Sequence, residues 1–304
     1  MHPRNRFRGG YDFEALIASI PALAAFVTPN RFGDASIDFA DPSAVKALNR
    51  ALLKQAYGLR WDLPPGYLCP PVPGRSDALH HLADLLGGGK ESAIPRGPFV
   101  RVLDVGVGAN CIYPLIGASE YGWRFVGSDT DPVALRAARK LVAGNPGLSD
   151  LIECRQQPSP ASIFKNVIQP GEMFDLSMSN PPFHASAREA RAGTMRKRRN
   201  LGADEGAEVV LNFGGKAGEL WCPGGEPGFV RRMIDESSAF RGQCRWFTTL
   251  VSKSAHLPLL YKALRKVEPA DVKILEMAQG QKRSRILAWT FQGPPKNAGR
   301  PLGY

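Results

Sequence analysis

The stretch Val100-Arg101-Val102-Leu103-Asp104-Val105-Gly106-Val107-Gly108-Ala109-Asn110 decides the fold of this 304-residue chain. Its first six residues are mainly apolar and have the length of a single buried strand. The two glycines that follow permit a tight turn and let a ligand approach the backbone closely. A helix is predicted next, over residues 112–119. A G-x-G turn without the third glycine of dinucleotide-binding folds is weak evidence by itself, so its meaning depends on the rest of the chain.

Strands and helices alternate from this turn onwards. Further strands are predicted at residues 124–128, 151–154, 174–179, 244–251, 272–277 and 286–291, and further helices at 132–143, 162–168, 227–240 and 256–267. This alternation is typical of an α/β fold with a doubly wound, mostly parallel sheet. Only Gly280-Gln281-Lys282-Arg283 separates the last two strands, which is too short for a crossover helix. These strands should therefore form an antiparallel hairpin at one edge of the sheet.

Residues 1–98 do not begin this alternation, and we predict a small, mainly helical region that starts with a basic arm. Asp41-Pro42 supplies an N-cap and a first-turn proline for one helix, which Gly58 ends. The other elements predicted here are a helix over residues 12–26, a strand fragment at 37–39, an ordered loop at 63–75 and a helix at 77–86. The chain thus divides into residues 1–98, an α/β domain at 99–292 and a flexible tail at 293–304.

The net charge of +11 favours a polyanionic partner, because basic side chains neutralise phosphates and release their counterions. The alternative is a generic basic protein that its charge keeps in solution. The 5 cysteines are odd in number and no pair has metal-ligand spacing, so we expect reduced thiols, no disulfide framework and no metal site. No apolar signal segment or membrane-length stretch is present, and we predict a cytoplasmic protein that does not bind membranes.

Asn180-Pro181-Pro182-Phe183 directly follows the strand predicted at residues 174–179. The two prolines fix φ and remove two backbone donors, so this turn is rigid. It presents the side-chain oxygen of Asn180 and a backbone carbonyl on one edge, with an aromatic face beside them. Two acceptors and an aromatic ring are suited to holding the planar amino group of a heteroaromatic ring. For the box taken alone, an ordinary strand-to-loop turn remains the alternative.

The second predicted strand ends in Gly127-Ser128-Asp129, roughly twenty residues after the glycine turn, where an acidic residue commonly binds ribose hydroxyls. Asp129 could instead cap the next helix, but Asp131-Pro132 already supplies that cap. A nicotinamide enzyme has no use for the Asn180 box. S-adenosylmethionine, which carries both a ribose and a transferable methyl group, fits both features.

Taken together, these residues resemble the class I S-adenosylmethionine-dependent methyltransferases that modify exocyclic amines. More specifically, the chain is similar to the ribosomal RNA large subunit methyltransferase F family, the 23S rRNA (adenine(1618)-N6)-methyltransferases. The shared segments are His2-Pro3-Arg4-Asn5-Arg6, Asp41-Pro42 with Ala44-Val45, Pro71-Val72-Pro73 with Arg75, Gly108-Ala109 with Cys111-Ile112-Tyr113-Pro114-Leu115, and the Asn180 box. The resemblance runs from residue 2 to about residue 292. It implies a class I methyltransferase Rossmann-like fold with a seven-stranded sheet.

The resemblance also implies roles for individual residues. The catalytic residues would be Asn180, Pro181, Pro182 and Phe183. The S-adenosylmethionine-binding residues would be Arg75, Asp104, Gly106, Gly108, Asn110 and Asp129. Among these, Arg75 would meet the methionine carboxylate and Asp129 the ribose; a salt bridge under the proline-rich loop is the alternative for Arg75. Some relatives carry a lysine where this chain has Ala40, so a contact made by that lysine is not carried over.

Residues 185–225 interrupt the alternation and contain a cluster of cations. Their length and their position directly after the Asn180 box favour a substrate-binding loop over a solvated charge run. The residues predicted to bind RNA are Arg4, Arg6, Arg196, Lys197, Arg198 and Arg199. For Arg4 and Arg6 the alternative is a disordered basic arm.

The predicted reaction is methylation of the N6 amino group of a specific adenine in 23S rRNA, either naked or in a large-subunit assembly intermediate, by a monomeric enzyme. Two other functions stay open: an N-methyltransferase that acts on DNA adenine or protein glutamine, and a non-catalytic RNA-binding protein with this fold. The basic arm and loop favour nucleic acid, and no target-recognition domain for DNA is evident. The combination of Gly106, Gly108, Asp129 and Asn180 argues against a loss of catalysis.

Overall fold

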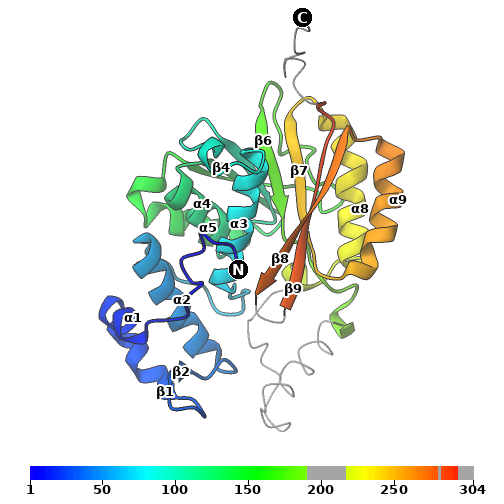
Figure 1. Ribbon diagram of the computed structural model, residues 1–304. Helices are drawn as coiled ribbons and strands as arrows, with labels where there is room; N and C mark the ends of the chain where they lie inside the picture. The colour runs from blue at the N-terminus through cyan, green and yellow to red at the C-terminus, as the bar shows by residue number, and fades with distance from the viewer. Residues whose placement is uncertain (190–216, 280–281, 294–304) are drawn as a thin grey trace, which may run out of the picture.

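The computed structural model describes residues 1–189, 217–279 and 282–293. Within these residues, a 7-stranded sheet with the order β5-β4-β3-β6-β7-β9-β8 forms the centre of the molecule (Figure 1). Its strands are β3 (Arg101–Val105), β4 (Arg124–Asp129), β5 (Ile152–Gln156), β6 (Phe174–Ser179), β7 (Cys244–Val251), β8 (Asp271–Gln279) and β9 (Lys282–Thr290). The first five strands in this order, β5, β4, β3, β6 and β7, pair in parallel. Strand β9 pairs antiparallel with both β7 and β8. The predicted fold class, including the antiparallel hairpin at one edge, is confirmed.

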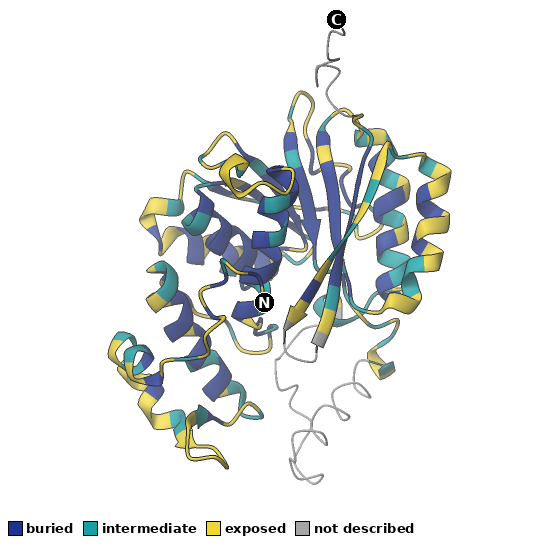
Figure 2. Ribbon diagram, in the orientation of Figure 1, coloured by how far each residue is buried: buried dark blue, intermediate teal, exposed yellow. Residues whose placement is uncertain are grey.

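Helices cover both faces of this sheet (Figure 1). One face carries α3 (Val72–Leu86), α4 (Ile112–Tyr121) and α5 (Pro132–Ala143), and the other carries α8 (Gly225–Ser237) and α9 (Leu257–Val267). Successive residues of β3 point to opposite faces, as strand geometry requires. Val102 belongs to the buried cluster of α3 to α5, and Leu103 to the cluster of α8 and α9. Figure 2 shows the central strands largely buried between these two helical layers, whereas the edge strand β8 is mostly exposed or half-buried.

The N-terminal region packs on the same core as α3 to α5. It contains α1 (Phe13–Ser19), the 3-10 helix η1 (Pro21–Phe26), the hairpin β1 (Val27–Pro29) with β2 (Ala35–Ile37), and α2 (Pro42–Tyr57). Leu16 and Leu52 belong to the same buried cluster as Leu115 of α4. The remaining short helices are η2 (Glu91–Ala93), η3 (Pro146–Leu148), α7 (Ala217–Leu220), η4 (Ser238–Phe240) and η5 (Ser254–His256). In the described part of the chain, every helix is too short or too polar to cross a lipid bilayer.

Two helices begin at the predicted Asp-Pro pairs. Asp41 Oδ1 accepts a hydrogen bond from Ser43 N at the start of α2, and Asp131 Oδ1 accepts one from Val133 N at the start of α5, each at 2.7 Å. A proline occupies the first turn of both helices. Gly58 ends α2 with a φ of 70°, the left-handed conformation that glycine adopts without strain.

The helix predicted at residues 162–168 is absent; these described residues form turns. The amides of Ile163, Phe164 and Lys165 donate to the carboxylate of Glu236 on α8 at 2.7, 2.9 and 2.5 Å. Asn166 has a φ of 69°, which interrupts any helix at that point. A distant acidic side chain therefore replaces the local helical hydrogen bonds.

The ordered loop predicted at residues 63–75 is also partly wrong, because α3 begins inside it. Pro71 is the N-cap residue of α3, and Pro73 lies in the first turn, where a helix needs no N–H donor. The proline-rich sequence thus starts a helix here instead of preventing one. This earlier start places Arg75 on α3.

Candidate active site

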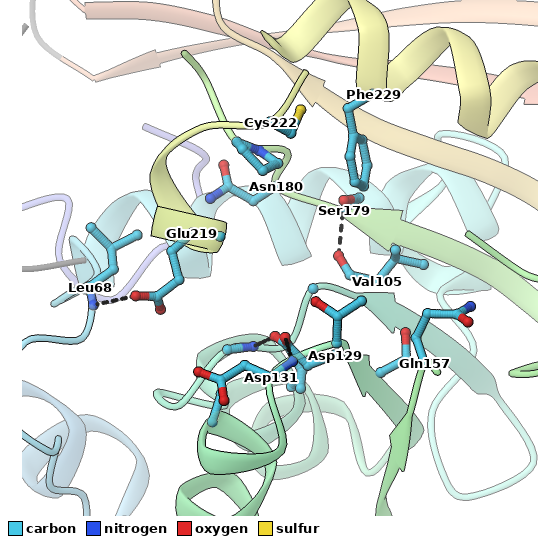
Figure 3. A pocket seen from close by; sticks show the side chains of 18 of the residues that line it. Leu68, Val105, Asp129, Asp131, Gln157, Ser179, Asn180, Glu219, Cys222 and Phe229 are labelled. Atoms are coloured by element: carbon cyan, nitrogen blue, oxygen red, sulfur yellow. Dashed lines mark hydrogen bonds between the residues drawn. The ribbon is translucent and has the colours of Figure 1, made fainter. Parts of the chain in front are cut away.

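A cavity of about 380 Å³ opens where β3, β4 and β6 end (Figure 3). Val105 of β3 lies opposite Ser128 in β4 and Ser179 in β6, and both pairings are parallel. The carboxyl ends of the three strands therefore meet at one edge of the sheet. The order of the strands reverses at β3, and ligands of open α/β sheets bind at such a switch point.

The glycine turn forms the floor of this cavity. Gly106 and Gly108 have φ of 82° and 64°, in the region that strains other residues. Gly106 N donates to Ser128 O and Gly108 N to Asp129 Oδ2, both at 2.9 Å. A Cβ built on Gly106 would meet no atom within 4 Å, so the space above the backbone is open to a ligand.

Asp129 lines the cavity from the end of β4. Its Oδ1 accepts from Asp131 N at 2.9 Å, while Asp131 caps α5. Asp129 is therefore not the helix cap, as predicted. Burial raises the pKa of its carboxyl group, and the hydrogen bonds from backbone amides oppose that rise. Because carboxylate oxygens can accept more than one hydrogen bond each, both remain suited to hydroxyl donors.

Asn110 and Arg75 line the same cavity. Asn110 Nδ2 donates to Leu68 O at 3.3 Å, and Asn110 Oδ1 accepts from Ile112 N at 3.1 Å. Arg75 Nη1 donates to Tyr113 Oη at 2.8 Å, and its Nε is buried without a hydrogen-bond partner among the described residues. A guanidinium group with an unsatisfied buried donor is suited to a ligand carboxylate.

Asp104 is 1% exposed and is not among the residues that line the cavity. Burial raises the pKa of its carboxyl group to about 8, the charge of Asp129 adds to the rise, and Arg75 opposes it. Neither oxygen has a hydrogen-bond partner within the described residues. The structure thus places Asp104 behind the turn, and its predicted contact with the cofactor stays a prediction.

Asn180 and Pro182 line the cavity at the end of β6. Ser179 Oγ donates to Val105 O at 2.9 Å and so ties this strand end to the glycine turn. Asn180 Oδ1 is buried and has no hydrogen-bond partner in the described part of the chain. A buried acceptor without a partner is costly, and a ligand donor would remove that cost.

The rest of the box lies beside the cavity. Pro181 is buried, whereas Phe183 is 38% exposed and does not line the cavity. The backbone that follows is held by the return of the chain near α7: His184 N donates to Leu220 O, and Cys222 N to His184 O, both at 3.1 Å. These two hydrogen bonds hold His184, which follows Phe183, against residues 220–222.

Arg4 and Arg6, the two predicted RNA-binding residues that the structure describes, do not line the cavity. Arg4 Nη2 donates to Asp84 Oδ1 on α3 at 2.7 Å, and Arg6 Nε to Glu120 Oε2 on α4 at 3.0 Å. The arm is thus held against two helices, and a contact between these arginines and RNA stays a prediction. Arg196, Lys197, Arg198 and Arg199 lie outside the described residues.

The sequence analysis did not identify many of the cavity-lining side chains, among them Gln157, Glu219 and Phe229. Gln157 N donates to Asp129 O at 2.8 Å, and Phe229 projects from α8 above Ser179 (Figure 3). Each comes from a segment far from the glycine turn and belongs to no spacing pattern. The only available signal was the position of Glu219 inside the long insertion after the Asn180 box. Among the described residues, no group of three or more His, Cys, Asp or Glu side chains could hold a metal ion.

The residues present fit S-adenosylmethionine. The open space above the Gly106 backbone fits the methionine moiety, and the acidic Asp129 fits the ribose. Arg75 Nε, which has no partner among the described residues, fits the carboxylate. Asn180 lines the same cavity, and its Oδ1, which has no hydrogen-bond partner within the described residues, is suited to the amino group that receives a methyl group.

Comparison with known proteins identifies the family. A family model described as RNA methyltransferase matches residues 1–293. The ribosomal RNA large subunit methyltransferase F of Cronobacter sakazakii is 57% identical over 292 residues, which cover 96% of this chain and 93% of the relative. The chain belongs to the ribosomal RNA large subunit methyltransferase F family. The methyltransferase F of Serratia proteamaculans is similar at 55% identity over 300 residues, covering 98% of this chain and 89% of that protein.

Solved structures of a human protein, METTL16, are also similar to this chain. The METTL16 catalytic domain in complex with the MAT2A 3′UTR hairpin 1 has a TM-score of 0.81 and 33% identity, with 97% of this chain and 99% of that chain covered. The N-terminal domain of human METTL16 in complex with S-adenosylhomocysteine has a TM-score of 0.76 and 31% identity, with 96% and 99% covered. The class I methyltransferase fold is therefore shared over nearly the whole chain.

Proposed function

We propose that this protein transfers a methyl group from S-adenosylmethionine to N6 of one adenine in 23S rRNA, the family position adenine 1618. The observation that carries the proposal is the buried Oδ1 of Asn180, which has no hydrogen-bond partner among the described residues and belongs to a residue that lines the cavity formed by β3, β4 and β6. The relatives named ribosomal RNA large subunit methyltransferase F support an rRNA substrate. The RNA-bound METTL16 domain supports recognition of a folded RNA.

The enzyme uses S-adenosylmethionine, which supplies a methyl group on a positively charged sulfur when it is bound. Arg75 would bind the methionine carboxylate, and Asp129 would accept hydrogen bonds from the ribose hydroxyls. The turn at Gly106 and Gly108 would lie under the methionine moiety. Asn110 lines this part of the cavity and would contribute polar contacts there.

Recognition of the adenine amino group depends on the Asn180 box. The N6 lone pair of adenine is delocalised into the ring, which makes N6 a weak nucleophile. Asn180 Oδ1 and the Pro181 carbonyl would each accept one N6 hydrogen, which favours a tetrahedral N6 with its lone pair aimed at the methyl group. The reaction is then an in-line displacement that depends on positioning, and the surplus N6 proton leaves to water afterwards.

Phe183 would stack on the target adenine, and Pro182 would shape the turn beside it. Stacking of an aromatic side chain on a base contributes about 1–3 kcal/mol. The 38% exposure of Phe183 is consistent with a surface that a base covers when RNA binds. The adenine has to be unpaired or flipped out of a helix to reach this position.

The substrate would be 23S rRNA, either naked or within a large-subunit assembly intermediate, and the enzyme would act as a monomer without a metal ion. An rRNA substrate also favours a cytoplasmic location. Mapping N6-methyladenosine in 23S rRNA from cells with and without this protein tests the substrate directly. Loss of the modification at a single adenine is expected, and an unchanged map would contradict the proposal.

The role of Asn180 is tested by Asn180→Ala. Methyl transfer should fall by about 10²–10³-fold, the scale for loss of one transition-state hydrogen-bonding group. Cofactor affinity should be unchanged, because Asn180 does not support the glycine turn. Single-turnover transfer and calorimetric titration with S-adenosylmethionine measure the two quantities separately. Transfer within a few-fold of wild type would show that Asn180 does not orient the amino group.

A further inference from the structure

Glu219 reaches the cavity from α7 and joins three separate segments around it (Figure 3). Its Oε2 accepts from Leu68 N at 3.0 Å, although the two residues are 151 positions apart. The carbonyl of Leu68 accepts from Asn110 Nδ2 at 3.3 Å. The peptide groups of Leu68 therefore link the glycine turn to α7.

The other carboxylate oxygen of Glu219 stands close to the glycine turn. A Cβ built on Gly108 would lie 3.4 Å from Glu219 Oε1 and 3.3 Å from Asn110 Nδ2. Gly108 is one of the two turn glycines that form the floor of the cofactor cavity. Glu219 thus places a negative charge directly beside the position proposed for the methionine moiety.

The methionine end of the cofactor is a zwitterion, so it needs a cation for its carboxylate and an acceptor for its ammonium group. Arg75 is suited to the first. The cavity-lining carboxylates in the described part of the chain are Asp129, Asp131 and Glu219. Asp131 caps α5 with one oxygen and accepts from Tyr67 Oη at 2.8 Å with the other. Asp129 is the proposed ribose ligand.

We propose that Glu219 is a cofactor-binding residue whose carboxylate binds the α-ammonium group of the methionine moiety. This inference rests on the cofactor site proposed above. Glu219 and Arg75 would then recognise the two charges of the amino acid as a pair. The contact also ties cofactor binding to α7, which lies inside the insertion that follows the Asn180 box.

Glu219→Gln removes the charge and keeps an oxygen that can accept from Leu68 N. By calorimetry, the affinity for S-adenosylhomocysteine should fall about 10- to 100-fold, the scale of a hydrogen bond between charged groups. Decarboxylated S-adenosylmethionine keeps the ammonium group and should also bind the variant more weakly than wild type. Methylthioadenosine lacks both charged groups and should bind the variant and wild type equally.

Unchanged affinity for S-adenosylhomocysteine would overturn the proposal. An equal loss for methylthioadenosine would also overturn it, because Glu219 would then act on the ribose or on the fold. Glu276→Gln is the matched control, since this side chain is 64% exposed and pairs with Arg285 in the β8–β9 hairpin. It should leave all three affinities unchanged.

Two further variants separate this inference from the cofactor site itself. Asp129→Asn should weaken all three ligands, because each carries the ribose. Arg75→Met should weaken S-adenosylhomocysteine but not the decarboxylated ligand. If neither variant changes binding, the proposed cofactor site is wrong; if both behave as expected and Glu219→Gln does not, only the role of Glu219 fails.

Discussion

At the scale of single residues, Asn180 and Asp104 both have buried side-chain oxygens without a hydrogen-bond partner among the described residues. Asn180 lines the cavity, and a ligand donor would satisfy its buried Oδ1. Asp104 is 1% exposed and separated from that space. Burying a charge without a partner costs much more than burying a neutral group. The two side chains therefore have different consequences: Asn180 favours ligand binding, and Asp104 makes stability depend on pH.

The pH dependence follows from the pKa of Asp104, which burial raises from 3.8 to about 8 in the folded protein. As pH rises from about 4 to about 8, the unfolded chain ionises at this position while the folded protein keeps its proton, so stability is lost. Asp104→Asn cannot ionise and escapes this loss. Its free energy of unfolding relative to wild type should rise by about 3–4 kcal/mol between pH 5 and pH 8, because each pH unit in this interval contributes about 1.4 kcal/mol. Urea titrations at the two pH values measure this difference, and a constant difference would contradict the raised pKa.

At the scale of elements, local signals predicted the starts of α2 and α5 correctly. Asp41 and Asp131 accept hydrogen bonds from amides two residues ahead, so the capping interaction is complete within a few residues of sequence. The turns at residues 162–168 differ, because their amides bind Glu236 on α8. A local pattern cannot contain a partner that lies about seventy residues away along the chain.

One ion-pair network joins three strands and gives a prediction at this scale. Glu172, just before β6, accepts from Arg155 Nη1 of β5 at 2.7 Å and from Arg101 Nη2 of β3 at 3.0 Å. Its side chain is 14% exposed. The hydrogen bond from Arg155 is the main cause that lowers the pKa of Glu172 to about 2. The carboxylate therefore stabilises the fold at neutral pH, where it is ionised.

Glu172→Gln should lower the free energy of unfolding by about 1–2 kcal/mol at pH 7, because the pair partly faces solvent. The stabilisation is fully present above the unfolded pKa of 4.5 and is lost as pH falls toward 2. The gap between wild type and variant should accordingly shrink across that interval. Denaturant titrations at pH 7 and pH 3 provide the comparison. A gap of the same size at both pH values would mean that packing, not charge, makes the contribution.

At the scale of the whole molecule, the positive charge should serve RNA binding. We expect neutralisation of Arg196, Lys197, Arg198 and Arg199 to weaken RNA binding and to leave S-adenosylmethionine affinity unchanged. Each lost phosphate contact should reduce the log–log salt slope by roughly 0.7 for single-stranded RNA. Filter binding at several salt concentrations gives both affinity and slope. Wild-type values for both would mean that this run is a solvated surface.

Arg4 and Arg6 provide a comparison, because their positive charges have partners within the protein. Arg4 pairs with Asp84, and Arg6 with Glu120. Their position near the start of the chain predicted a basic arm, and the structure places that arm against α3 and α4. The net charge of the sequence does not show which basic side chains form ion pairs with acidic side chains of the same protein.

The sequence by itself determined the sheet class, the edge hairpin, the helix caps and the residues of the glycine turn and the Asn180 box. Each of these depends on periodicity, chain length or contacts within a few residues. Only the tertiary structure decided that Asp104 lies behind the turn, that Glu236 holds the backbone at residues 163–165, and that Glu219 reaches the cavity. These depend on side chains that parallel strands and crossover helices bring together from distant parts of the chain, where no local pattern records the contact.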